Sequence, residues 1–447
     1  MNFFEFFDTA VNCATDRHIS FHMPGHKGRP TGALFDSALP FDLTELPCTD
    51  NLLSPEKGGA LEKTYARIRK IYQTQSTIFS AGGATAALQA SISAVMRSRG
   101  KKVLCDRSVH MSVIYTLSHC DAQPVWLLRD KGGNLDPAAV IHAIKAHQDT
   151  ACIIITSPDY YGRICDISAI ASEAKKYNIP VIVDSAHGAH LPFFQDGALS
   201  AYKNGASFVI ESLHKTLPAL TGAALLHSDG TLHEKMLITA MIHFASSSPS
   251  YLVSLSICQA IAFMHTKGGA LLDTLLSDID IAKKKLATSG FSFINPPIAD
   301  PFRLCVKPPA GRSPRDLYHY LYKHGIICEF YDTDTVVLIP SVMNTTSDFD
   351  ILCALCADFA KTPAGENPYS PPQLPAINPK AALTMTEALL AKAPRLFHLS
   401  EAKGRICAEP QAPYPPGTAV IVPGEIYDNC VIDYLSDCGF DEVWVIE

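Results

Sequence analysis

The chain has 447 residues, of which 47% are hydrophobic and 18% charged, and its formal net charge is −7. A chain of this length and composition can bury a sizeable core in more than one structural unit. The net negative charge, without a long lysine and arginine block, argues against a nucleic-acid partner. Because no apolar run approaches the ~18 residues needed to span a bilayer, we expect no membrane partner either.

The first 45 residues are rich in glycine, proline and histidine and predict an extended N-terminal arm, 1–45, with little core of its own. The opening stretch carries Glu5 and Asp8 and lacks a basic leader. We therefore expect no signal peptide and a cytoplasmic location.

The middle of the chain alternates strand and helix patterns. Short β-branched runs at 151–158, 180–187 and 207–212 predict buried strands, and 167–178 has helical periodicity. Strand, helix and strand at this spacing predict a doubly wound, mainly parallel sheet in a large α/β domain, 46–270. In such sheets the ligand site forms beyond the carboxyl ends of the strands.

From residue 271 long helical patterns with isolated strands predict a smaller α+β domain, 271–366, and a proline-rich break then opens a C-terminal appended segment, 367–447. The fourteen cysteines are scattered. The one CxxC pair, Cys353 and Cys356, falls on the apolar face of a predicted helix, which favours core packing over metal or redox work. A reduced interior is consistent with the cytoplasm.

Lys215 follows the predicted strand 207–212 and precedes a stretch of small residues. A lysine that attacks a carbonyl must lose its proton, which burial and cationic neighbours favour. His214 is adjacent, and Ser212 is placed to reach an anionic group. Taken alone, this pattern fits an ordinary surface lysine better than a lysine that attacks a carbonyl.

Asp184 ends another predicted strand and is followed by His187 and His190. A strand-end carboxylate can pair with a protonated ring nitrogen, or it can cap a helix. The two histidines form an HxxH pair, but without a third ligand of suitable spacing we expect no metal site.

Two further features lie earlier in the chain. A glycine-rich turn at 79–85 runs into a helical pattern, and amides at such a helix start can cradle a phosphate. His110 follows the predicted strand around 101–106, where an imidazole can stack on a planar ring. Each feature alone has an ordinary structural explanation.

The order of parts, phosphate turn, stacking histidine, strand-end aspartate and lysine, resembles fold-type I enzymes that use pyridoxal 5'-phosphate (PLP), the aspartate-aminotransferase superfamily. Local sequence motifs narrow the resemblance to the short bacterial form of the Orn/Lys/Arg decarboxylase family. The motifs that carry it span nearly the whole chain: FHMPGHKG (21–28), 42–63, SPDYYG (157–162), DSAHGAH (184–190), LHK (213–215), SSSPSYL (246–252) and YPPG to PGE (414–425).

This resemblance implies decarboxylation of lysine, ornithine or arginine to an amine and CO2, with a place in polyamine biosynthesis. Lys215 would form the Schiff base with PLP, and His214 would act as an acid beside it. Asp184 would pair with the pyridine nitrogen, His187 would lie near the phenolic oxygen, and His110 would stack on the ring.

The remaining implied contacts concern the phosphate and the substrate. Ser212 would hold the phosphate together with Gly83, Ala84 and Thr85. The segment Ser246–Ser248, including Ser247, would complete this site from a neighbouring subunit, which implies a homodimer or a higher homo-oligomer. Glu329 and Asp332 could bind the distal cation of a small cationic amino acid, although both also fit a solvated surface.

The sequence departs from the family pattern at Ala84 and Ala86 in the phosphate turn, and at Met111, Asp159 and Ser185. These departures bear on substrate identity more than on PLP binding. Two alternatives stay open: an aminotransferase or another lyase on the same fold, for which Arg303 could clamp the α-carboxylate, and a non-catalytic PLP-binding homologue.

Overall fold

The computed structural model describes residues 4–15, 27, 29, 32, 37–45, 51–52, 54–362, 369, 379–391, 394–413 and 418–446. Nearly half of the predicted N-terminal arm lies outside these residues, including the motif at 21–28 apart from Lys27. Most of the proline-rich break and the YPPG stretch at 414–417 also lie outside them. The chain divides into two compact units, Met1–Val95 with Pro180–Ala270, and Met96–Ile179 with Leu271–Glu447.

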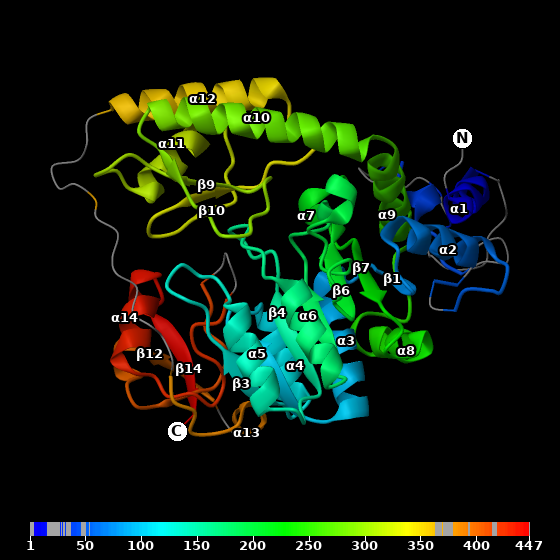
Figure 1. The fold of residues 1–447 in the computed structure, drawn as a ribbon, viewed down its shortest axis with the longest axis horizontal. Helices are drawn as coiled ribbons and strands as arrows, with labels where there is room; N and C mark the ends of the chain where they lie inside the picture. Colours follow the sequence, from blue (N-terminus) through cyan, green and yellow to red (C-terminus); the bar gives the residue numbers. More distant parts are fainter. Residues whose placement is uncertain are drawn as a thin grey trace. The chain divides into compact units, whose positions relative to one another are not determined.

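The main sheet has seven strands in the order β1-β7-β6-β5-β4-β2-β3 (Figure 1). The first unit supplies β1 (Ser76–Ser80), β7 (Ala224–Ser228), β6 (Phe208–Ser212) and β5 (Val181–Asp184). The second unit supplies β4 (Cys152–Thr156), β2 (Lys102–Asp106) and β3 (Gln123–Leu127). β5 and β6 pair in parallel, as do β2 with β3 and β4, while β7 is antiparallel to β1 and β6. This arrangement confirms the predicted doubly wound, mainly parallel α/β fold.

In the first unit every residue of β1, β5, β6 and β7 is buried, as the apolar strand runs require. Its helices are α1 (Glu5–Thr15), α2 (Ala60–Tyr72), α7 (Leu213–Thr216), α8 (Glu234–Phe244) and α9 (Tyr251–Phe263), and α3 (Gly83–Arg99) begins in it. The α9 helix starts where the Ser250 side chain accepts the amide of Val253, which satisfies one of the free donors at a helix start.

In the second unit the sheet strands alternate with α4 (Met111–His119), α5 (Pro137–Ala146) and α6 (Ile167–Lys176). Aspartate side chains cap two of these helices. Asp136 accepts the amide of Ala138 with Pro137 at the first helical position, and Asp166 accepts the amide of Ala169. Both patterns are strong local signals for a helix start.

The second unit also contains a four-stranded sheet in the order β10-β11-β9-β8. Its strands are β8 (Ser292–Phe293), β9 (Leu304–Lys307), β10 (Phe330–Tyr331) and β11 (Val336–Leu338), accompanied by α10 (Gly269–Thr288), α11 (Pro314–Lys323) and α12 (Thr346–Lys361). Figure 1 shows α10 and α12 running alongside each other, and the Lys285–Asp350 ion pair of 2.7 Å joins them.

The C-terminal part of the second unit forms a small antiparallel sheet in the order β12-β14-β13. Its elements are α13 (Met385–Leu389), β12 (Arg395–His398), β13 (Ile406–Cys407), α14 (Asn429–Asp437) and β14 (Glu442–Ile446). It has a core of its own that includes the fully buried Ile421, Val431, Leu435, Val443 and Val445. Short 3₁₀ turns elsewhere occupy Leu39–Phe41, Leu191–Phe193, Gln195–Gly197 and Leu399–Glu401, and a π-helical stretch occupies Met264–Gly268.

The cysteines of the CxxC pair lie on α12. Both side chains are buried, the Cys353 thiol points to the Ala282 carbonyl, and burial raises the pKa of Cys356 to about 12. Such thiols stay protonated, so core packing is confirmed for this pair. Cys13 is disulfide-bonded, which was not expected from the sequence. Within the described ranges, no helix is both long and apolar enough to cross a membrane.

Candidate active site

Lys215 lies just beyond the carboxyl end of β6, on the short helix α7. The buried strand ends at Ser212, and the lysine side chain is half-buried three residues later. Its Nζ lies 3.1 Å from Nε2 of His187. An imidazole at this distance can exchange a proton with the amine, which a lysine nucleophile requires.

Asp184 occupies the matching position on the neighbouring strand. It ends β5, its residue is 4% exposed, and in the parallel register it faces Ile210, two residues before the end of β6. Its Oδ1 accepts the amide of Ala186 at 3.1 Å, so the side chain closes a local turn and does not cap a helix. A carboxylate so deeply buried is costly unless another group balances its charge, which a protonated ring nitrogen would do.

His214 and Ser212 lie beside each other at the start of α7. The His214 Nδ1 is 3.4 Å from the Ser212 Oγ and 3.3 Å from the Ala223 carbonyl oxygen. Since a carbonyl only accepts, the ring proton belongs on Nδ1 and Nε2 is left as an acceptor. Burial lowers the pKa of His214 below its ordinary 6.5, and the neighbouring Lys215 charge adds to this, so the imidazole is neutral at pH 7.

The predicted phosphate turn connects β1 to α3. Gly83 has a φ of +69°, which favours glycine, and its N–H donates to the Gly222 carbonyl at 2.9 Å. The Gly83 amide is therefore already engaged. Ala84 and Thr85 belong to the first turn of α3, where backbone N–H groups lack intrahelical acceptors, so these two amides are the better phosphate donors.

The same turn borders a cavity of ≈ 380 Å³ in the first unit. Its lining residues include Gly82 and Thr85 of the turn and Ser246 and Ser248 of the later segment. The structure thus brings the SSSPSYL segment of the same chain to the phosphate turn. Ser247 is exposed and is not among the lining residues, whereas its neighbours Ser246 and Ser248 are.

The approach between turn and segment is close at Gly82. A β-carbon there would lie 2.9 Å from the Ala86 β-carbon and 3.3 Å from that of Ala245. Only glycine keeps the first turn of α3 open at this point. With an amine at Lys215, a buried carboxylate at Asp184 and amides at the α3 start, the first unit fits PLP.

His110, Glu329, Asp332 and Arg303 lie in the second unit. His110 is half-buried at the N-cap of α4, where its Nδ1 accepts the Ser112 amide at 3.2 Å. Arg303 is 5% exposed, and its Nη2 lies 3.9 Å from Oδ2 of Asp300.

The two acidic candidates differ in their surroundings. Glu329 is exposed. Asp332 accepts the Tyr161 hydroxyl at 2.6 Å and the amides of Asp334 and Thr335 at 2.9 and 2.8 Å. Burial raises the pKa of Asp332, and the same burial, with the Asp332 charge, raises that of Tyr161. The Asp332 carboxylate is therefore held in a fixed orientation.

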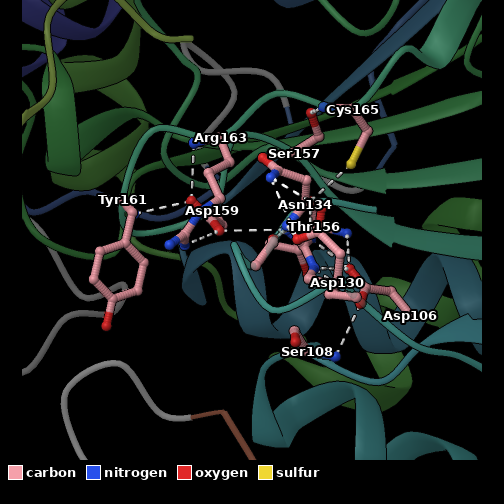
Figure 2. Close-up of polar contacts among 12 residues, drawn as sticks. Asp106, Ser108, Asp130, Asn134, Thr156, Ser157, Asp159, Tyr161, Arg163 and Cys165 are labelled. Carbon is pink, nitrogen blue, oxygen red and sulfur yellow. Dashed lines mark hydrogen bonds and ion pairs between the residues drawn. The ribbon is translucent and has the colours of Figure 1, made fainter. Parts of the chain in front are cut away.

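A buried charge network in the second unit was not found from the sequence. The Arg129 guanidinium donates to both oxygens of the fully buried Asp106, with a shortest distance of 2.6 Å, and reaches Oδ2 of Asp159 at 3.3 Å. Figure 2 shows that Asp159 also accepts the backbone amides of Tyr161 and Arg163. Asp159 departs from the family pattern, and that departure was the signal in the sequence that pointed to this loop.

Comparison with known proteins identifies the family of the chain. The family model "Orn/Lys/Arg decarboxylase, major domain" matches residues 5–306, and "Orn/Lys/Arg decarboxylase, C-terminal domain" matches residues 366–439. The uncharacterized protein YaaO of Bacillus subtilis is 30% identical over 91% of this chain and 88% of its own length. The arginine decarboxylase of Halalkalibacterium halodurans is 26% identical over 96% of this chain and 92% of that protein.

Solved structures show the same fold. The Francisella novicida lysine decarboxylase LdcF superimposes with a TM-score of 0.83 at 18% identity, covering 99% of this chain and 81% of that one. A variant of SPT with PLP has a TM-score of 0.53 at 17% identity and covers 66% of this chain and 74% of its own. The chain therefore belongs to the Orn/Lys/Arg decarboxylase family, and the expectation of a PLP-dependent decarboxylase of fold type I is confirmed.

Proposed function

We propose that this enzyme removes the α-carboxyl group of a basic amino acid, lysine, ornithine or arginine, with PLP attached to Lys215. The contact of 3.1 Å between Lys215 and His187 carries the proposal, since it pairs the nucleophile with a proton acceptor at the strand ends. When bound, PLP takes up the electron pair that remains on Cα as CO2 departs. The chain supplies orientation, charge and protons.

Asp184 would keep the ring nitrogen of PLP protonated. Its carboxylate is buried, and its place at the end of β5 fixes it beside the strand that leads to Lys215. A fixed charge in a shielded site acts more strongly than one in water.

Lys215 is the better candidate for returning a proton to Cα. His214 is neutral at pH 7 and has its ring proton engaged with the Ala223 carbonyl, so it first has to gain a proton before it can act as an acid. Lys215 can receive a proton from His187 at 3.1 Å and pass it on.

For the phosphate we propose the amides of Ala84 and Thr85, the Thr85 hydroxyl and Ser212. The Ser246–Ser248 segment borders the same turn, and hydroxyl groups there suit an anionic group. We further propose that this segment also serves the site of a second subunit in a homodimer.

For the substrate's distal cation we propose Glu329 and Asp332. Both are carboxylates, and Asp332 is oriented by Tyr161 and two backbone amides. A preoriented carboxylate recognises an ammonium or guanidinium group with less loss of side-chain freedom. The amine product would serve polyamine biosynthesis in the cytoplasm.

A substrate screen tests this function. Purified protein with PLP is given arginine, ornithine or lysine in turn, and released CO2 and the amine are identified. Arginine comes first because the relatives matched nearly end to end in Halalkalibacterium halodurans and Bacillus subtilis are named arginine decarboxylases. One amino acid should yield its amine, and the Lys215→Ala variant should yield none. Amino-group exchange with an added keto acid, without CO2, would instead establish an aminotransferase.

A further inference from the structure

The C-terminal part of the second unit holds the loop that carries His110. Residues 107–110 link β2 to α4, and His110 forms an antiparallel bridge with Thr418. Three residues before His110, the Arg107 Nη2 donates to Glu425 Oε2 at 2.8 Å and to the Val420 carbonyl at 3.2 Å.

The Arg107–Glu425 ion pair is buried. The two side chains are 9% and 5% exposed, and the guanidinium lies 4.9 Å from the centre of the Trp126 ring. Glu425 also accepts the Val422 amide at 2.9 Å, so the carboxylate is held by its own turn. A buried pair with a fixed partner geometry allows the arginine one position, because moving it leaves a charge without compensation.

Asp106, the last residue of β2 and the residue before the loop, is held by other contacts. Asp106 accepts the Ser108 amide at 2.9 Å, as Figure 2 shows, and it also receives the Arg129 guanidinium. The loop is therefore fixed at Asp106 by the sheet and at Arg107 by the C-terminal residues.

The helix that follows His110 is attached to the same C-terminal region at two more points. Thr386 on α13 donates to the Ser118 carbonyl near the end of α4 at 2.7 Å. Tyr115 on α4 bonds Glu409, and burial together with that carboxylate raises the pKa of the tyrosine. C-terminal residues thus contact the loop, the start of α4 and its last turn.

We propose that Arg107 and Glu425 are positioning residues that set the place of His110, the residue expected to stack on the cofactor ring, so that the C-terminal region acts on PLP binding through this histidine. This inference rests on the proposed function and on the expectation from the family resemblance that His110 stacks on the PLP ring. Its Nδ1 is engaged with Ser112, so the ring is fixed relative to α4, and its place in the site follows the loop.

The first test uses Glu425→Gln, which keeps size and an acceptor but removes the charge. We expect the PLP dissociation constant to rise about tenfold, within the range of coupling between residues in contact. Hydrogen–deuterium exchange of the holoenzyme should quicken at amides 106–119 and stay unchanged at 208–215. Arg107→Lys keeps the charge but loses the planar fork, so its effect should be smaller, and it serves if Glu425→Gln does not fold.

The matched control is Asp149→Asn, which removes a second ion pair at β2, between Asp149 and Lys102 at 2.5 Å. Since the Asp149 side chain is 68% exposed, we expect neither PLP affinity nor exchange to change. A purely structural role of Glu425 would lower the thermal midpoint without altering PLP affinity at temperatures where the variant is folded.

A double-mutant cycle with His110→Ala decides whether the effect runs through His110. We expect Glu425→Gln to weaken PLP binding much less when His110 is already absent. Equal effects in both backgrounds, or unchanged exchange at 106–119, would overturn the inference. A failure of the proposed function has a different readout. If Lys215→Ala still turns over the substrate, the proposed function is wrong, but the change in hydrogen–deuterium exchange at 106–119 is not affected.

Discussion

The Nζ of Lys215 lies 3.1 Å from Nε2 of His187, and each residue stands three positions past the end of its strand. The two strands, β5 and β6, are adjacent and parallel. Because parallel strands present their carboxyl ends at one edge of a sheet, equal offsets bring the two side chains together. This pairing gives the lysine a proton partner before any substrate is present.

Replacing His187 by asparagine should slow the attachment of PLP to the apoenzyme by about 100-fold, the lower range for removing a positioned general base. Without the imidazole, the Lys215 amine loses its nearby proton acceptor. Stopped-flow absorbance after mixing apoenzyme with PLP measures the rate. His233→Asn, at the exposed N-cap of α8, is the control, and an equal rate in His187→Asn and wild type would contradict the pairing.

Asp184→Asn should keep PLP bound but lower kcat by about 100-fold or more, the scale seen when a preorganised charge or donor is removed. An amide cannot balance the ring nitrogen's positive charge, while the shape of the site is kept. Parallel measurements of bound PLP and kcat separate the two effects. A near-wild-type kcat would refute this role.

We predict that His214 makes the stability of the folded protein depend on pH. Burial lowers its pKa below 6.5, so the folded protein binds this proton more weakly than the unfolded chain does. The stability it contributes is present above pH 6.5 and is lost as pH falls through the lowered pKa. As pH is lowered from about 8 to about 5, the thermal midpoint should therefore fall more steeply in wild type than in His214→Gln. Parallel curves would contradict the burial effect.

Asp332→Asn should raise KM for the basic amino acid by about tenfold or more with a smaller change in kcat, as expected for losing a charged hydrogen bond made equally in ground and transition states. Tyr161→Phe is the matched variant, since it removes the hydroxyl at 2.6 Å but keeps the carboxylate. Its KM should rise less than that of Asp332→Asn, because the carboxylate remains and the amides of Asp334 and Thr335 still orient it. If both variants lose stability alike and neither changes KM, Asp332 only stabilises its turn and does not bind the substrate.

Strand ends are the part of the site that the sequence predicts well. The runs that contain Asp184 and Ser212 are short and β-branched, so both strands follow from the pattern. The end at Ser212 is as predicted, whereas β5 ends at Asp184, three residues before the end of the predicted run 180–187. The glycine turn before α3 is likewise visible because Gly83 needs a positive φ. These signals are local, and local signals are what a single sequence carries.

Long-range pairings escaped prediction. Arg107 and Glu425 are 318 positions apart, and neither belongs to a periodic pattern that points to the other. Similarly, the Gly83 amide was expected to serve a phosphate, but it donates to the carbonyl of Gly222, which lies two residues before β7, the antiparallel neighbour of β1. Such partners depend on how distant strands and turns meet, which hydrophobic periodicity does not encode.

The central claim is that Lys215 carries PLP and that the enzyme releases CO2 from a basic amino acid. Lys215→Ala and wild type, each with PLP, are compared for visible Schiff-base absorbance and for amine formed from arginine, ornithine and lysine. Wild type should show the absorbance band and yield one amine, and the variant should show neither. Undiminished turnover in Lys215→Ala would contradict the account.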